Sequence, residues 1–73
     1  MRLRLAIDGM LSVHATRAVF MALAGVRGVT SAEVEIGSAI VDADRTVSDD
    51  EIRAAIDGVG MRVARITREL PVM

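Results

Sequence analysis

The start of the chain alternates between apolar and polar residues. Leu3, Leu5 and Ile7 occupy every second position, with arginine or alanine between them. A period of two is typical of a strand that buries one face and exposes the other. We therefore predict a strand over residues 2–7, which the Asp-Gly pair at 8–9 ends.

Residues 14–24 follow the spacing of an amphipathic helix, with apolar residues three and four positions apart. Ser12 precedes this run and can cap the helix through its hydroxyl. Gly25 and Gly28 flank the exit of the helix, where a left-handed residue is usual. The buried face of the helix is predicted to hold Ala15, Val19, Ala22, Leu23 and Val26.

Two further strands and a second helix follow. Residues 32–36 and 39–43 alternate as the first strand does, and the Gly-Ser pair at 37–38 is a tight-turn signal. Ser48 and Glu51 have the spacing of a capping box, which predicts a helix from this point to the glycines at 58 and 60. Residues 61–66 are predicted to form the last strand. The second helix is expected to bury Ile52, Ala55, Ile56 and Val59.

The element order is strand, helix, strand, strand, helix, strand. In this order, two helices can cover one face of a four-stranded antiparallel sheet, so we predict an α+β open-faced sandwich. Residues 1–67 form the domain, and residues 68–73 form a C-terminal tail because Pro71 interrupts strand pairing. The predicted core consists of Leu3, Leu5, Ile7, Val19, Leu23, Val26, Val34, Ile36, Val41, Ile52, Ile56 and Val63.

Composition removes several classes of function. The chain has 73 residues and no cysteine, which excludes disulfides and thiolate metal sites. Its net charge of −1 argues against an electrostatic nucleic-acid binder. No apolar run could span a bilayer and no signal peptide is evident, so we expect a cytoplasmic location without membrane contact. The start at Met1 leads us to expect a whole protein or an N-terminal domain.

The run GMLSVHA at residues 9–15 resembles the metal loop of the heavy-metal-associated domain family, whose motif reads GMTCxHC. Gly9, Met10 and His14 fit this motif, whereas Ser12 and Ala15 stand at the two cysteine positions. The later turns and strands resemble the family as well. The resemblance implies a ferredoxin-like βαββαβ fold related to copper chaperones, in which the thiolates that hold Cu(I), Zn(II) or Hg(II) are missing.

Three residues near this loop are candidates for a weaker metal site. His14 is the only histidine, and imidazole is a metal ligand. The resemblance places Met61 beside the loop, and Ser12 adds a hydroxyl. Together these residues could hold Cu(I) or Zn(II) weakly, although we expect no cofactor. The resemblance implies that Met10 points into the core rather than at a metal.

Large apolar residues around the start of the first helix raise a second possibility. Phe20 and Met21 stand where family members usually carry polar residues, and Leu11 and Val13 lie in or next to the loop. These four residues either widen the core or form a contact surface. The second interpretation predicts a protein partner or a homodimer that docks at this end of the helix, with Phe20 as the anchor.

The uncovered face of the sheet is predicted to carry opposite charges on its two halves. The family's strand order gathers basic residues on one half of this face and acidic residues on the other. The division indicates either ordinary pairing of charges across strands or a bipolar docking surface that can pair with itself. The basic set is Arg2, Arg4 and Arg62, and the acidic set is Glu33, Glu35 and Asp42.

An enzyme is not expected. Ser12 and His14 lie two residues apart at a helix start, a spacing that does not orient an imidazole onto a hydroxyl. Two hypotheses remain. The first is an interaction module that has lost its metal site and acts as a dimerising or regulatory domain linked to metal transport. The second is a metal carrier with an altered site at His14 and Met61.

Overall fold

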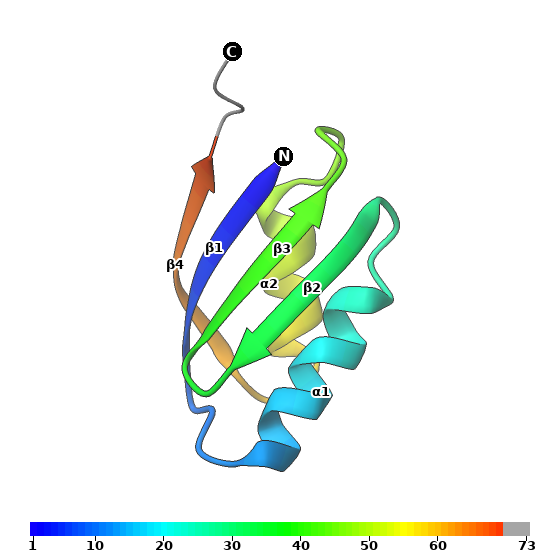
Figure 1. Cartoon of the computed structure of the whole chain (residues 1–73). Coiled ribbons are helices and arrows are strands. Elements are labelled where there is room, and N and C mark those ends of the chain that lie inside the picture. The colour runs from blue at the N-terminus through cyan, green and yellow to red at the C-terminus, as the bar shows by residue number, and fades with distance from the viewer. Residues whose placement is uncertain (70–73) are drawn as a thin grey trace.

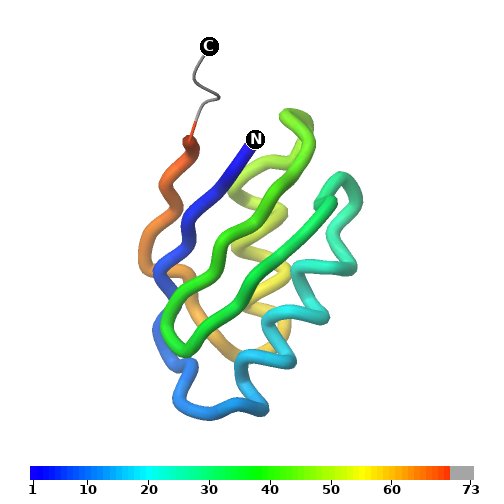
Figure 2. Tube along the Cα trace, viewed as in Figure 1, coloured from blue at the N-terminus to red at the C-terminus, as the bar shows by residue number. Residues whose placement is uncertain are grey.

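The computed structural model describes residues 1–69 as four strands and two helices in the predicted order (Figure 1). The strands pair as one antiparallel sheet in the order β2-β3-β1-β4, and both helices cover the same face (Figures 1 and 2). This arrangement confirms the predicted α+β, ferredoxin-like fold. The elements are β1 (Arg2–Asp8), α1 (Val13–Ala24), β2 (Val29–Glu35), β3 (Ser38–Ala43), α2 (Asp49–Asp57) and β4 (Arg62–Glu69).

Strand β1 lies in the interior of the sheet, paired with β3 on one side and β4 on the other. Its burial alternates residue by residue, so Leu3, Leu5 and Ile7 face the helices while Arg4 and Ala6 between them face water. The helices contribute Leu23 from α1 and Ile52 from α2 to the same core, and both side chains are fully buried. The apolar residues that alternate along the sequence therefore share one face of the sheet, and they form a single aliphatic core between the sheet and the helices.

Both helices begin at the predicted serine caps. Ser12 Oγ accepts a hydrogen bond from the Ala15 N–H at 3.2 Å, and Ser48 Oγ accepts one from the Glu51 N–H at 3.1 Å. The Ser48 hydroxyl also donates to the Glu51 carboxylate at 3.3 Å. Each cap satisfies an amide that has no partner within its helix.

One residue of the predicted core and one residue predicted on the buried face of the second helix are exposed. Ile36 lies in the two-residue turn between β2 and β3 and is 60% exposed, because β2 ends at Glu35. Val59 is 37% exposed because α2 ends before Gly58. Val26 and Val34 pack against the core but are only half-buried. The core also contains four residues that the predicted list left out, namely Met10, Ala39, Ala43 and Val47.

Strand β4 is longer than predicted, running to Glu69 rather than to residue 66. Residues 67–69 continue the pairing with β1, opposite residues 4–2. The Arg68 guanidinium donates to Asp49 Oδ1 at 2.8 Å and to the Val47 carbonyl at 2.6 Å. These bonds tie the end of β4 to the start of α2. The predicted boundary at residues 67 and 68 therefore falls inside a strand, and Pro71 lies outside the described residues.

Neither of the two described helices is long and apolar enough to cross a membrane.

The contact between Gly28 and Val47 generates a first prediction. Gly28 has a φ of +96°, and a Cβ placed on it would lie 2.6 Å from Val47 Cγ2. Gly37 has a similar φ of +85°, but a Cβ there would meet nothing within 4 Å. Gly37→Ala should cost about 1–2 kcal/mol from backbone strain alone. Gly28→Ala should cost about 1–3 kcal/mol more because the core is overpacked. Urea unfolding of both variants measures the difference, and equal losses would contradict the clash.

Two neighbouring positions on α1 generate a second prediction. Leu23 is fully buried, whereas Met21 is 67% exposed. Leu23→Ala should lower the free energy of unfolding by about 2–5 kcal/mol, because it leaves a cavity under the sheet. Met21→Ala should change it by less than about 0.5 kcal/mol, as exposed substitutions usually do. Thermal melts followed by circular dichroism test both, and a wild-type melt for Leu23→Ala would show that the core is assigned wrongly.

Candidate functional site

The loop between β1 and α1, residues 9–12, is held by its neighbours rather than by a ligand. Gly9 adopts a φ of +87°, a conformation that glycine allows without strain. Met61, which follows α2, lies against it, since a Cβ on Gly9 would be 3.7 Å from Met61 Cγ. The structure therefore brings Met61 beside the loop, as the resemblance implies.

Met10 is a core residue. Its side chain is buried, and its Sδ accepts a hydrogen bond from the Gly37 N–H at 3.3 Å. This bond joins the loop to the turn between β2 and β3. The sulfur is therefore occupied by packing and by the hydrogen bond, which confirms the prediction that Met10 points inward.

The two residues at the family's cysteine positions perform structural tasks. The Ser12 hydroxyl accepts the Ala15 N–H and thereby caps α1. The methyl group of Ala15 is half-buried and packs against the core. A neutral hydroxyl and a methyl group do not suit Cu(I) or Zn(II), which bind thiolate sulfur and imidazole nitrogen.

Among the described residues, His14 and Met61 are the side chains near the loop that offer a sulfur or imidazole donor not engaged in a hydrogen bond to the backbone. His14 is exposed in the first turn of α1, and Met61 is half-buried against the core. Within residues 1–69, no group of three or more His, Cys, Asp or Glu side chains is arranged to hold a metal ion. The donors present therefore do not fit a soft-metal site of the family's kind.

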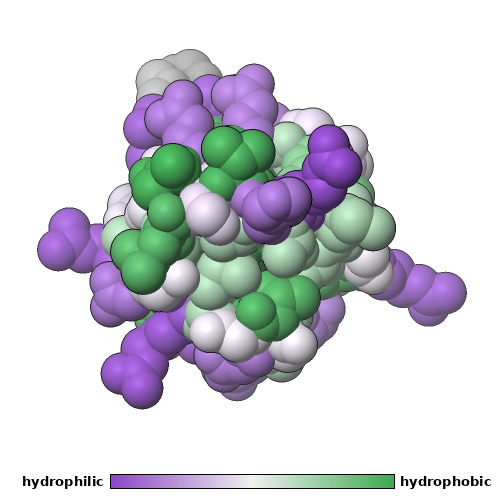
Figure 3. All heavy atoms as spheres, turned by 90° about the horizontal axis from the view of Figure 1, so that it is seen from below, coloured by the Kyte–Doolittle hydropathy of each residue, from purple (hydrophilic) through white to green (hydrophobic). Residues whose placement is uncertain are grey.

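Exposed aliphatic side chains gather at the end of the molecule that carries this loop. The loop supplies Leu11, the helix start supplies Val13, the β2–β3 turn supplies Ile36, and the segment after α2 supplies Val59. Their exposures are 88%, 75%, 60% and 37%, respectively. Figure 3 views the molecule from this end and shows hydrophobic side chains in separate spots among paler residues, with charged side chains around the margin. We call these four residues the loop-end surface.

Phe20 and Met21 lie farther along α1 and on different sides of it. Phe20 is 45% exposed and lines a hollow between α1 and β2 together with Val13 and Val34. Met21 does not line that hollow, because one residue advances a helix by about 100°. Of the four predicted contact residues, Val13 and Phe20 therefore share this hollow, and Met21 lies outside it. Sequence reasoning missed Ile36 and Val59, although their positions next to turn glycines were a signal.

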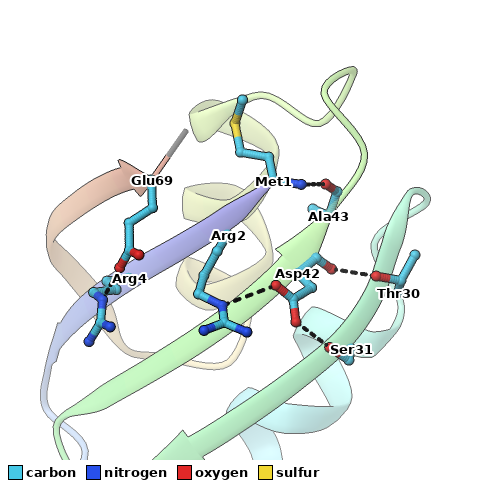
Figure 4. A network of polar contacts seen from close by, with 8 residues as sticks. All are labelled: Met1, Arg2, Arg4, Thr30, Ser31, Asp42, Ala43 and Glu69. Carbon is cyan, nitrogen blue, oxygen red and sulfur yellow. Dashed lines mark hydrogen bonds and ion pairs between the residues drawn. The ribbon is translucent and has the colours of Figure 1, made fainter. Parts of the chain in front are cut away.

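The open face of the sheet carries ion pairs across its strands (Figure 4). Arg2 of β1 pairs with Asp42 of β3 at 3.3 Å, and Arg4 pairs with Glu69 of β4. Hydrogen bonds from Ser31 and then from Arg2 hold the pKa of Asp42 below its ordinary value of 3.8. Most of the charges at the centre of this face are thus neutralised within the chain.

No protein-family model and no curated protein matches the chain. Solved structures do match. The CopZ metallochaperone is 33% identical with a TM-score of 0.82, and the match covers 88% of this chain and all of that one. The chain belongs to the heavy-metal-associated domain family.

Other members have the same fold. A copper-binding domain from HMA7, a P-type ATPase, is 28% identical with a TM-score of 0.82, and 93% of this chain and 96% of that chain are covered. The yeast copper transporter domain CCC2A is 25% identical with a TM-score of 0.75, and 88% and 94% are covered. These neighbours are named as metallochaperones or metal-binding domains. The heavy-metal-associated fold predicted from the loop is therefore confirmed, while the present chain has no cysteine.

The contacts of Asp42 generate a prediction about pH. Because its folded pKa is lowered, its contribution to stability is present above pH 3.8 and is lost as the pH falls through the folded value. Asp42→Asn should therefore make the stability of the protein fall less steeply on acidification below pH 3.8. Asp44→Asn is the matched substitution, because Asp44 is exposed and makes no ion pair among the described residues. Urea midpoints measured across this acidic range compare the three proteins, and identical slopes would contradict the assignment.

Proposed function

We propose that this heavy-metal-associated domain is a protein-interaction module that docks through the loop-end surface and carries no thiolate metal site. The observation that carries the proposal is the exposure of Leu11, Val13, Ile36 and Val59 around a loop with no thiolate. Large aliphatic side chains grouped in water are typical of a contact surface. The four residues come from four separate segments, so their grouping is a property of the fold.

The chemistry of the loop supports docking over metal transfer. Ser12 caps a helix, and Met10 is buried with its sulfur bonded to the β2–β3 turn. Both residues keep the loop in shape without a ligand. A loop of fixed shape with an apolar outer surface suits contact with another folded domain, because little conformational entropy is lost on binding.

A second copy of the chain is the partner that we propose. Exposed apolar side chains at one end of a small domain are covered most simply by a two-fold axis, since the same surface of each copy then packs against the other. The named neighbours include a metallochaperone and a domain of a P-type ATPase, so a regulatory role linked to metal transport is consistent with the family. A cytoplasmic location remains a prediction.

The alternative is weak carriage of Cu(I) or Zn(II) through His14 and Met61, with help from Ser12. One observation favours it, which is the position of Met61 against Gly9. Against it stand the half-buried side chain of Met61 and the engagement of the Ser12 hydroxyl in the helix cap. A thioether and one imidazole lack the charge of two thiolates.

Association is tested by sedimentation over a wide range of protein concentration. The wild type should form a dimer, and Leu11→Glu with Ile36→Glu should remain monomeric because charges are placed in an apolar contact. Met21→Glu is the matched control, since Met21 is equally apolar and exposed but lies outside the loop-end surface, and it should dimerise. A wild type that is monomeric at every concentration would refute the homodimer.

Metal binding is tested by titration with Cu(I) under reducing conditions against a competing chelator. The wild type should show no tight stoichiometric binding, and His14→Ala should behave identically. The double variant Ser12→Cys with Ala15→Cys should bind tightly, because two thiolates at a helix start form a soft-metal site. Tight binding by the wild type that disappears in His14→Ala would instead establish the altered carrier.

A further inference from the structure

Strand β2 forms one edge of the sheet, because the strand order begins with it and only β3 pairs with it. An edge strand presents unpaired N–H and C=O groups to which another extended chain can add. Proteins often protect such edges with lysine or proline. Residues 29–35 contain neither. The register with β3 shifts between Val29 and Ser31, so the regular part of the edge, to which a further strand could add, is residues 31–35.

A trough of mixed apolar and polar lining runs beside this edge on the helix side of the sheet. Its polar lining residues are Thr16, Arg17, Thr30 and Ser31. Phe20 of α1 lines two hollows along the seam between α1 and β2. In the first it is joined by Ala24, Val29 and Ala32, and in the second by Val13 and Val34. Small β2 side chains under a large aromatic ring leave room for apolar side chains that would arrive on an added strand.

The opposite side of the same edge is acidic. Glu33 and Glu35 are exposed on the open face and line a hollow with Ser38 and Ile40. Neither glutamate forms an ion pair within residues 1–69, whereas Asp42 beside them is paired with Arg2. The two glutamates at the edge of the open face therefore have no ion-pair partner within residues 1–69.

We propose that the edge of β2 binds an extended, positively charged segment of another protein, which adds to the sheet as a fifth strand. Side chains of a strand alternate between its two faces. An occupant with basic residues at every second position would place them beside Glu33 and Glu35. The apolar residues between them would enter the trough beside Phe20. The bound segment is thus defined by alternation of basic and apolar residues.

A second copy fits this edge less well. Strand β4 is the other edge of the sheet and carries Arg62 and Arg65 on its exposed face, but Val63 is buried in its own core and cannot enter the trough. Pairing of β2 with β2 would bring four glutamates together at one seam. An extended segment of another protein has no side chains committed to a core of its own, and it need not bring glutamates to the seam. Val13 borders both surfaces, but the edge of β2 and its two glutamates lie outside the loop-end surface, so the inference does not depend on the proposed function.

Binding is tested with the synthetic peptide Arg-Val-Arg-Val-Arg-Val-Arg, labelled at one end and titrated with the folded protein at an ionic strength of about 0.1 M, where the Debye length is about 10 Å. Saturable binding is expected, with slower amide hydrogen exchange over residues 31–35 and unchanged exchange over 62–69. The peptide in which glutamate replaces arginine should not bind. Glu33→Arg with Glu35→Arg should weaken binding by about tenfold or more, because two attractions become repulsions. Phe20→Ala should weaken it as well while keeping its salt dependence.

The matched control is Asp50→Arg with Asp57→Arg, which changes the net charge equally on exposed positions of α2. This variant should retain binding within about twofold, since salt screens distant charges. Equal losses in the two double variants would show unspecific attraction and overturn the proposal. Absence of binding, or binding without slower exchange in β2, would overturn it too. Sedimentation of the protein alone tests whether a second copy occupies the edge instead. If the wild type assembles and the double variant Arg62→Glu with Arg65→Glu does not, a second copy is the occupant.

Discussion

The fold depends on burying the alternate side chains of β1. This strand has neighbours on both sides, and its three aliphatic residues pack under both helices. The chain has no disulfide to restrict its unfolded state, because it has no cysteine. Nor does the structure contain a buried polar side chain among the described residues. Stability therefore comes from one aliphatic core, in which each substitution removes a large share of the total.

This dependence explains why the loop keeps its shape without thiolates. Gly9 supplies the left-handed turn, Met10 fills the core and bonds to the β2–β3 turn, and Ser12 caps α1. All three tasks serve folding and none of them needs a metal. Gly9 and Met10, which remain from the family motif, are thus residues that the fold requires. At the two cysteine positions of the motif, Ser12 caps a helix and the Ala15 methyl group packs against the core.

Much of the fold could be predicted because local signals agree with the tertiary structure. The alternation of Leu3, Leu5 and Ile7 identified the central strand, and the serines at 12 and 48 identified both helix starts. Boundaries were less certain. Strand β4 extends to Glu69 because residues 67–69 continue the pairing with β1, contacts that join distant parts of the chain. Ile36 was assigned to the core because alternation alone does not show where a strand gives way to a turn.

The candidate site was predictable in its parts but not in its arrangement. Hydropathy identified Leu11, Val13 and Phe20 as unusual, yet it could not show that Phe20 lies beside an edge strand while Leu11 lies at the end of the molecule. The structure separates these features into two surfaces of different chemistry. One is apolar and surrounds the loop, where hydrophobic burial would drive association and salt would have little influence. The other combines an aromatic trough with two glutamates at a sheet edge, where charge steers the approach and main-chain hydrogen bonds fix the register. The two surfaces meet at Val13, which lines the trough and belongs to the loop-end surface, so a partner on one is expected to influence binding at the other.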